Sequence, residues 1–430
     1  MQTNFSDLNL AEPLLRALAA EQYSTPTPIQ AKSIPPMLSG RDVLGLAQTG
    51  TGKTAAFALP ILQRLMNPTG PVGREPRVLV LTPTRELAIQ VHDSFRTYGR
   101  FLKLRTTAVY GGVSTKHQID ALARGTDIVV ATPGRLLDLC TQNAVRFGRL
   151  SVLVLDEADR MLDMGFLPDV KRIIARLPKE RQTLLFSATM PESIARFADS
   201  ILTKPVRVEA APPATTVELI KQYVIHAAGA EKPAVLADLL RDPTVSRALV
   251  FARTKHGANR ITERLARSDI RAEAIHGNKS QGARQKALGD FRSGHVRVLV
   301  ATDIAARGID VDGISHVINF DIPNEAETYV HRIGRTARAG ASGTAISLCD
   351  GSERSFLADI EKLTRLRLQV IAHPRATPGL AQAKPAPRPA SQSRQPQNRQ
   401  PGRKQRGWSH PASRRRAAAG GSNHSARAAT

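Results

Sequence analysis

Residues 43–59 read Val43-Leu44-Gly45-Leu46-Ala47-Gln48-Thr49-Gly50-Thr51-Gly52-Lys53-Thr54-Ala55-Ala56-Phe57-Ala58-Leu59. An apolar run leads into a glycine loop and a helical run follows, so the pattern predicts a strand, a loop and a helix. Because loop N–H groups and a helix N-terminus bind anions, we expect residues 47–54 to cradle phosphates. Lys53 would neutralise the outer phosphates and Thr54 would bind Mg²⁺. The alternative is a glycine turn that only closes a strand. The sequence also departs from the usual phosphate-loop pattern, because Ala47 stands where the first glycine is expected.

The chain has 430 residues, which suggests two or three domains, and a formal net charge of +24. Such a charge indicates a polyanionic partner and is unusual for a metabolic enzyme. Cys140 and Cys349 show no paired spacing, so we expect no disulfide framework, no zinc site and a cytoplasmic location. We also expect no signal peptide and no membrane helix, because the chain lacks a basic and apolar leader and long apolar runs.

Short apolar runs alternate with helical patterns along most of the chain, which predicts α/β domains with mostly parallel sheets and helices on both faces. The runs are 77–81, 127–131, 151–155 and 182–186 in the first half, and 247–251, 271–275, 296–300, 316–320 and 344–348 in the second. Helical patterns cover 256–267, 281–292 and 326–337. Polar residues follow many of these strands, and ligands bind at the carboxyl ends of parallel strands.

Composition places the domain boundaries. We expect a first domain over residues 1–207, a proline-containing linker over 208–216 and a second domain over 217–372, which lacks a glycine-Lys-Thr loop of its own. Residues 373–430 carry twelve Lys and Arg from Pro374 onward and no Asp or Glu. This segment is also rich in Pro, Gln, Ser, Ala and Gly, so we expect a disordered basic tail.

Two charged groups carry the predicted chemistry. Asp156 and Glu157 directly follow an apolar strand, where Asp156 would hold Mg²⁺, partly through water, and Glu157 would orient the attacking water. The alternative is a solvated acidic helix start. Arg332, Arg335 and Arg338 are three residues apart, which puts them on one face of a helix. They would stabilise a γ-phosphate, or form a solvated or RNA-facing basic surface.

In their order along the chain, these motifs resemble those of the DEAD-box ATP-dependent RNA helicases, and the chain looks most like the bacterial RhlE type. The resemblance covers about residues 1–370, with Asp156-Glu157-Ala158-Asp159 as the signature tetrad. It implies two tandem RecA-like domains, ATP and Mg²⁺ as cofactors, and RNA as partner. RNA-stimulated ATP hydrolysis would close the domains and unwind or remodel short RNA duplexes and RNA–protein complexes.

The resemblance also implies roles for single residues. Residues 3–31 contain a stretch similar to the Q motif, in which Gln30 would read the adenine edge, Phe5 would stack on the ring and Tyr23 would line the site. Asp310 would bind the ribose, and Arg335 and Arg338 would be arginine fingers. The RNA track would comprise Pro83, Thr84, Arg85, Gly111, Gly112, Thr132, Arg135, Arg253, Gln281, Arg284 and Thr302.

Other implied residues couple hydrolysis to unwinding. Ser187, Ala188 and Thr189 would transmit hydrolysis to strand separation, and Asp303 and His331 would lie at the interface between the domains. His331 is alternatively a structural histidine, as we expect for His276.

Two residues depart from the family pattern. Gln22 and Ala337 stand where glycine is usual. In the expected helix Ala337 would be more favourable than glycine by about 1 kcal/mol. We expect neither residue to abolish activity.

Several alternatives stay open. The tail combines Arg403 to Trp408 with Arg414, Arg415 and Arg416, so it could tether RNA through phosphate neutralisation and base stacking, or act as a solubilising or protein-binding segment. A DNA-translocating helicase and a non-catalytic RNA clamp are the rival functions. Ribosomal precursors, RNA-degradation machinery and structured RNA in the cold are all compatible partners.

Overall fold

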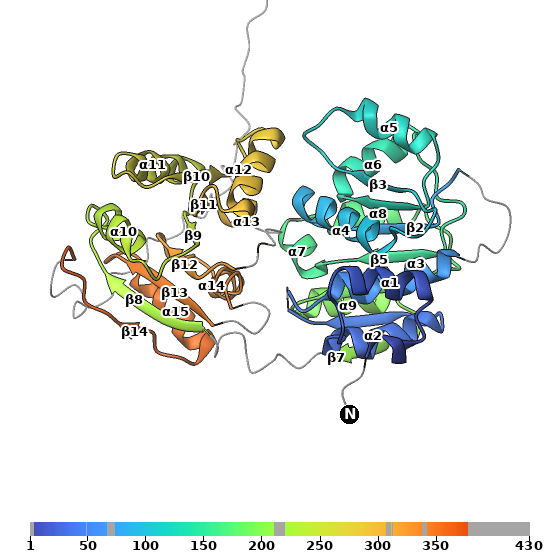
Figure 1. Cartoon of the computed structure of the whole chain (residues 1–430), viewed down its shortest axis with the longest axis horizontal. Coiled ribbons are helices and arrows are strands. Elements are labelled where there is room, and N and C mark those ends of the chain that lie inside the picture. Colours follow the sequence, from blue (N-terminus) through green and yellow to red (C-terminus); the bar gives the residue numbers. More distant parts are fainter. Residues whose placement is uncertain are drawn as a thin grey trace, which may run out of the picture. The chain divides into compact units, whose positions relative to one another are not determined.

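The computed structural model describes residues 4–48, 50–66, 74–209, 220–306, 311, 313–337 and 342–376 (Figure 1). They form two seven-stranded parallel sheets, which confirms the expected fold class. We call residues 4–209 the first domain and residues 220–376 the second domain. Their strand orders are β3-β4-β2-β5-β6-β1-β7 and β10-β11-β9-β12-β13-β8-β14, so the second sheet repeats the order of the first.

The first domain alternates strands and helices. Its strands are β1 (Val43–Leu46), β2 (Val78–Leu81), β3 (Thr106–Val109), β4 (Ile128–Ala131), β5 (Val152–Leu155), β6 (Gln182–Ser187) and β7 (Val206–Glu209). Its helices are the 3-10 helix η1 (Phe5–Leu8) and α1 (Glu12–Ala20), α2 (Pro28–Leu38), α3 (Lys53–Met66), α4 (Arg85–Tyr98), α5 (Thr115–Ala123), α6 (Pro133–Thr141), α7 (Ala158–Asp163), α8 (Leu167–Ile174) and α9 (Glu192–Ile201).

The second domain follows the same plan. Its strands are β8 (Ile220–His226), β9 (Ala248–Phe251), β10 (Ala272–Ile275), β11 (Val298–Ala301), β12 (His316–Asn319), β13 (Gly343–Cys349) and β14 (Gln369–Val370). Its helices are α10 (Lys232–Arg241), α11 (Lys255–Ala266), α12 (Gln281–Ser293), α13 (Asp303–Ala306), α14 (Ala326–Ile333) and α15 (Arg354–Thr364). Among the described residues, no helix is both long and apolar enough to cross a membrane.

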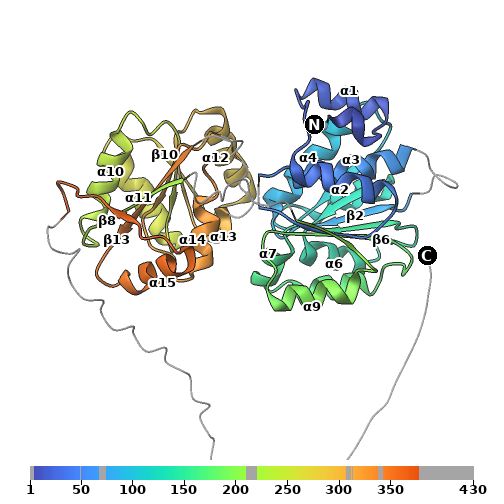
Figure 2. The same ribbon diagram turned by 90° about the horizontal axis from the view of Figure 1, so that it is seen from below.

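Each sheet is covered on both faces, which explains why its central strands are apolar throughout. In β2, Val78 and Val80 point into the core with α2, α3 and α4, whereas Leu79 and Leu81 point into the core with α6, α8 and α9. Figure 2 shows α2, α3 and α4 on one side of the first sheet and α6 and α9 on the other. In the second domain, α10 and α11 cover one face and α12, α14 and α15 the other.

Four strands were not expected from the sequence: β3, β7, β8 and β14. Three of them, β3, β7 and β14, are edge strands with half-buried or exposed residues, so they lack the continuous apolar run that marks a central strand. β7 pairs with β1 and reaches Glu209, which is inside the expected linker. Most of that linker and the tail from residue 377 lie outside the described residues.

Both departures from the family pattern adopt left-handed backbone conformations. The φ angles of Gln22 and Ala337 are 59° and 54°. The expectation that Ala337 lies in a helix is wrong, because α14 ends at Ile333. In the left-handed region a Cβ atom costs roughly 1–2 kcal/mol, so glycine would be more favourable at both positions.

We therefore predict that Gln22→Gly and Ala337→Gly each raise the free energy of unfolding by about 1 kcal/mol, because glycine relieves the strain. Urea denaturation of the full chain measures this effect. Ala358→Gly is the control, since Ala358 is exposed in the middle of α15, where glycine should cost about 1 kcal/mol. Destabilisation by all three changes would contradict the prediction.

Candidate functional site

The phosphate loop of the first domain connects β1 to α3. Gly50 and Gly52 have φ angles of 84° and 88°, and a Cβ atom on Gly52 would lie 2.4 Å from Nε2 of Gln30. Both glycines are therefore needed for the turn, and Gly52 also for the close approach of Gln30. Thr51 Oγ1 donates to the carbonyl of Gln48 at 2.7 Å. Thr49 lies outside the described residues.

Lys53 is the first residue of α3 and is 6 % exposed. Its Nζ donates to the carbonyl oxygen of Ala47 at 2.8 Å. No carboxylate of the described residues forms an ion pair with it. A buried ammonium group whose hydrogen bond goes to a carbonyl and not to a carboxylate attracts an anion, as expected for a phosphate-binding lysine.

Gln30 joins the Q-like segment to the phosphate loop. Its Oε1 accepts a hydrogen bond from the Thr27 backbone N–H at 2.8 Å, and its Nε2 donates to the carbonyl of Gly52 at 3.1 Å. The amide still has one N–H and one lone pair to offer to a base edge. The same side chain thus caps α2, holds the loop and remains able to recognise adenine.

A pocket of about 410 Å³ lies beside this loop. Its lining includes the expected residues Phe5, Tyr23, Gln30, Gly50, Gly52, Lys53, Thr54, Asp156 and Glu157. Phe5 is buried and Tyr23 is 47 % exposed. The sequence analysis missed Leu87, Gln90, Ser94 and Tyr98, which also line the pocket from α4. Their spacing of three or four residues along one helix face was the available signal.

The acidic pair at the end of β5 is fully buried. Burial raises the pKa of Asp156 to about 7, although the charge of Lys53 opposes the shift. Asp156 Oδ1 has no hydrogen-bond partner among the described residues. An unpartnered buried carboxylate oxygen facing a phosphate loop fits a hard cation such as Mg²⁺, which needs few protein ligands beside water and phosphate. The described residues contain no cluster of three or more His, Cys, Asp or Glu that would form a complete protein cage.

Glu157 adopts a left-handed backbone conformation with a φ angle of 55°. Burial opposes ionisation of its carboxylate, but the charges of Arg160 and Lys53 outweigh burial and lower its pKa. Arg160 Nη1 contacts Glu157 Oε2 at 2.7 Å, and both side chains are about 5 % exposed or less. The sequence analysis did not assign a role to Arg160, which keeps Glu157 ionised and oriented.

Asp159, the last residue of the tetrad, binds the Ser187-Ala188-Thr189 segment. Its Oδ2 accepts hydrogen bonds from Ala188 N (3.2 Å), Thr189 N (2.9 Å) and Thr189 Oγ1 (2.9 Å). In return, Ser187 Oγ accepts from Asp159 N at 3.2 Å. Four hydrogen bonds therefore join the acidic tetrad to the expected coupling segment, which the sequence alone did not reveal.

The RNA-track residues expected in the first domain lie at the carboxyl ends of β2, β3 and β4. The Thr84 side chain caps α4 by accepting from Leu87 N, and Thr132 occupies the N-cap position of α6 without a side-chain capping bond. A Cβ atom on Gly112 would lie 1.9 Å from Nη1 of Arg85, so this glycine leaves room for the guanidinium group. Arg135 donates to the carbonyl of Val113 at 3.2 Å from both Nη atoms. Arg85 and Arg135 thus both contact the segment 111–113.

The corresponding residues of the second domain also follow strands. Arg253 follows β9, Thr302 follows β11, and Gln281 and Arg284 lie in the first turn of α12. His276 is buried and bonds Asn259 Oδ1 at 2.8 Å, which agrees with the structural role expected for it.

The expectation that three arginines share a helix face is wrong, because α14 ends at Ile333 and Gly334 follows as its C-cap. Arg332 is 2 % exposed and forms a two-bond ion pair with Asp303, at 2.6 and 2.8 Å. It is therefore a structural residue of the second domain. Arg335 is buried beyond the helix, and His331 is half-buried within it. Asp310 and Arg338 lie outside the described residues.

Comparison with known proteins shows that each half of the chain matches a helicase domain family. Residues 27–197 match the DEAD/DEAH box helicase family, and residues 231–340 match the helicase conserved C-terminal domain. The chain is 42 % identical over 374 residues to the DEAD-box ATP-dependent RNA helicase CshA of Bacillus subtilis, covering 87 % of this chain and 75 % of that protein. The CshA of Streptococcus pneumoniae is 45 % identical over 365 residues, with coverage of 85 % and 69 %.

A solved structure supports the same assignment. Dbp5 of S. cerevisiae bound to RNA and ADP BeF3 superposes with a TM-score of 0.78 at 32 % identity, covering 86 % of this chain and 95 % of that one. The two bacterial relatives are named CshA, so they do not support the expected RhlE type.

We predict that Asp159 and Thr189 are energetically coupled. A double-mutant cycle with Asp159→Asn and Thr189→Val should give a coupling of about 1–2 kcal/mol in the free energy of unfolding, since the hydroxyl donates to a buried carboxylate. The matched control is Thr141→Val, whose hydroxyl bonds a helix carbonyl in α6 and should show no coupling to Asp159→Asn. Equal coupling for both threonines would contradict the assignment.

Proposed function

Because the chain belongs to the DEAD-box family of ATP-dependent RNA helicases, we propose that it hydrolyses ATP in the first-domain pocket and uses the reaction to unwind or remodel RNA. The observation that carries this proposal is the meeting of Lys53, Asp156, Glu157 and Gln30 around one pocket. A lysine for phosphate, a carboxylate pair for hydrolysis and an amide for adenine form a complete site for ATP.

The first-domain residues divide the chemistry among them. Lys53 neutralises the outer phosphates, and Glu157, kept ionised by Arg160, accepts a hydrogen bond from the attacking water and orients it. Thr54 and Asp156 would hold Mg²⁺, which supplies charge neutralisation on the phosphates. Through its hydrogen bonds, Asp159 transmits the structural change that accompanies ATP hydrolysis to Ser187-Ala188-Thr189.

The second domain completes the reaction cycle in this proposal. Arg335 and Arg338 act as fingers on the γ-phosphate, Asp310 binds the ribose, and Asp303 and His331 belong to the interface between the domains. ATP and RNA drive closure because each binds the closed state more tightly than the open one. Closure bends the bound strand and displaces a short partner strand.

RNA is held through its backbone. Thr84, Arg85, Thr132 and Arg135 in the first domain and Arg253, Gln281, Arg284 and Thr302 in the second offer hydroxyl, amide and guanidinium donors. Such groups bind phosphate and sugar oxygens without reading base sequence. Substrate choice then depends on RNA shape, the 2′-hydroxyl group and the tail. Ribosomal precursors and RNA-degradation machinery are the candidate settings, in a cytoplasmic location that suits the two free cysteines.

ATP hydrolysis measured without nucleic acid, with single-stranded RNA and with DNA of the same sequence tests this function. We expect strong stimulation by RNA alone. Equal stimulation by DNA would favour a DNA translocase. Bound ATP with no hydrolysis in any condition would favour a non-catalytic clamp.

We predict that Lys53→Ala and Glu157→Gln each lower kcat for RNA-stimulated ATP hydrolysis by about 100-fold or more, because each removes a group that acts on the phosphates or the attacking water. Circular dichroism should show a folded chain. Glu192→Gln, which changes an exposed carboxylate on α9, is the control and should leave turnover unchanged. Wild-type turnover in both site variants would refute the mechanism.

We also predict that deletion of residues 374–430 weakens RNA affinity about tenfold and flattens its salt dependence, since fewer counterions are released on binding. RNA-independent ATP hydrolysis should be kept. Replacing Arg414, Arg415 and Arg416 with Gln keeps the tail length and separates charge from length. An unchanged salt slope after deletion would remove the tail from the RNA interface.

A further inference from the structure

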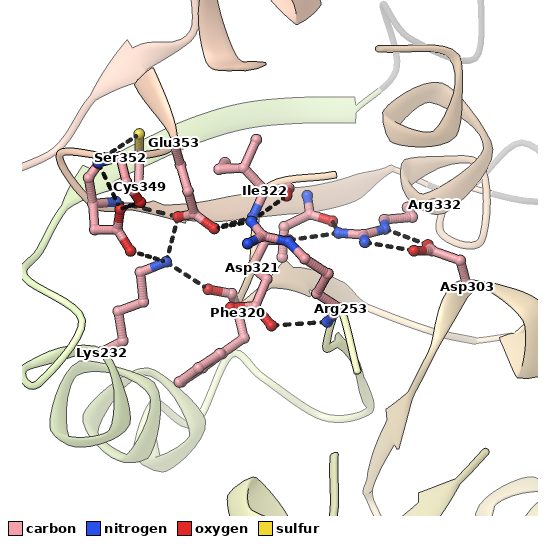
Figure 3. Close-up of polar contacts among 12 residues, drawn as sticks. Lys232, Arg253, Asp303, Phe320, Asp321, Ile322, Arg332, Cys349, Ser352 and Glu353 are labelled. Carbon is pink, nitrogen blue, oxygen red and sulfur yellow. Dashed lines mark hydrogen bonds and ion pairs between the residues drawn. The ribbon is translucent and has the colours of Figure 1, made fainter. Parts of the chain in front are cut away.

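The carboxyl end of the second sheet holds a cluster of charges in which two buried members, Lys232 and Glu353, have no role in the proposed function (Figure 3). Lys232 begins α10, Glu353 directly precedes α15, and Arg253 follows β9. The side chains of Lys232 and Glu353 are each 2 % exposed, whereas that of Arg253 is 40 % exposed. The cluster therefore combines a buried ion pair with one guanidinium group that faces solvent.

One member of this cluster, Lys232, occupies the place that the phosphate-loop lysine occupies in the first domain. Because the two sheets have the same strand order, β8 and α10 correspond to β1 and α3. Lys232 is thus the counterpart of Lys53. Its Nζ contacts Glu353 Oε2 at 2.5 Å, Phe320 O at 3.0 Å and Asp350 Oδ2 at 3.5 Å. All three donors of its ammonium group face acceptors of the same domain, so none remains for a phosphate.

Glu353 is the centre of the cluster. Its Oε2 accepts from Lys232 and from the Asp350 backbone N–H at 3.3 Å, and its Oε1 accepts from the Ile322 backbone N–H at 3.1 Å and from Arg253 Nη2 at 2.5 Å. Burial raises the pKa of Glu353, and the charge of Lys232 opposes that shift. Four donors fix the orientation of this carboxylate.

The guanidinium group of Arg253 is held through one of its nitrogen atoms, Nη2. Nη2 also donates to the Ile322 carbonyl at 3.1 Å, and the backbone N–H of Arg253 donates to Asp321 Oδ2 at 2.8 Å. The segment 320–322 is itself held from the other side, because Arg332 Nη1 donates to Asp321 O at 2.7 Å (Figure 3). No described residue accepts a hydrogen bond from Nε or Nη1 of Arg253.

We propose that Glu353, with its charge balanced by Lys232, is a positioning residue that aims the outer edge of Arg253 at an RNA phosphate. The three N–H groups on Nε and Nη1 match phosphate oxygens in geometry and charge. Without Lys232, the positive charge of Arg253 would have to neutralise the buried carboxylate of Glu353. With Lys232 present, that charge stays available to the RNA. This inference rests on the proposed RNA contact of Arg253.

A double-mutant cycle on RNA affinity tests the inference in the full chain. The dissociation constant of a labelled single-stranded oligouridine is measured with a non-hydrolysable ATP analogue over a series of salt concentrations. The proteins are the wild type, Arg253→Ala, Glu353→Gln and the combination. Arg253→Ala should weaken binding about tenfold and reduce the salt slope by about 0.7, the value for one phosphate contact on a single strand.

Glu353→Gln should weaken RNA binding about fivefold in the wild-type background and leave it unchanged in the Arg253→Ala background, because Glu353 acts through Arg253. ATP affinity should stay the same. Glu361→Gln is the matched control, since its carboxylate lies in α15, the helix that follows Glu353, and accepts the Leu368 backbone N–H. If Glu353→Gln does not fold, Lys232→Met/Glu353→Gln, which removes both buried charges, takes its place in both backgrounds.

Equal losses of affinity in the two backgrounds would overturn the inference, because general damage to the fold does not depend on Arg253. No effect of Arg253→Ala would also overturn it, since there would be no contact to position. In both cases RNA-stimulated ATP hydrolysis by the wild type would leave the proposed function standing. Loss of that stimulation in the wild type would instead refute the function itself.

Discussion

Buried charges at the carboxyl ends of parallel strands must be neutralised, by other side chains or by a ligand, and this constraint shapes both domains. An uncompensated ion inside a protein costs several kcal/mol, so each such group is either paired or part of a binding site. The two sheets have the same strand order, and they satisfy this constraint in opposite ways.

In the first domain Arg160 pairs with Glu157, but two other buried charged groups lack a charged hydrogen-bond partner within the described part of the chain. Lys53 has a backbone carbonyl as its partner, and Asp156 Oδ1 has none among the described residues. A bound nucleotide and its metal ion would compensate the charges of these groups. The second domain completes its charges internally, because Lys232 binds Glu353 and Arg332 binds Asp303. One topology thus gives a ligand site in one copy and a rigid support in the other.

The sequence predicted the elements whose pattern is local. Most central strands, the phosphate loop and the acidic tetrad have short, continuous signals, and the structure places them as expected, whereas β8 lies inside its sheet but alternates buried and exposed residues and was missed. Edge strands β3, β7 and β14 escaped because partial exposure breaks the apolar run. The bonds of Asp159 to residues 188–189 and of Glu353 to Arg253 join segments far apart in sequence, so no spacing rule could reveal them.

Three of the non-glycine residues with a left-handed backbone conformation show how strain relates to the site. Glu157 has a left-handed conformation that costs roughly 1–2 kcal/mol, and it persists because Arg160 fixes its side chain in the buried site. Gln22 and Ala337 share that conformation, and neither has an ionisable side chain that could be fixed in this way. Strain at Glu157 therefore coincides with a buried ion pair beside the pocket, whereas at Gln22 and Ala337 it falls where the chain bends at a residue with a Cβ atom.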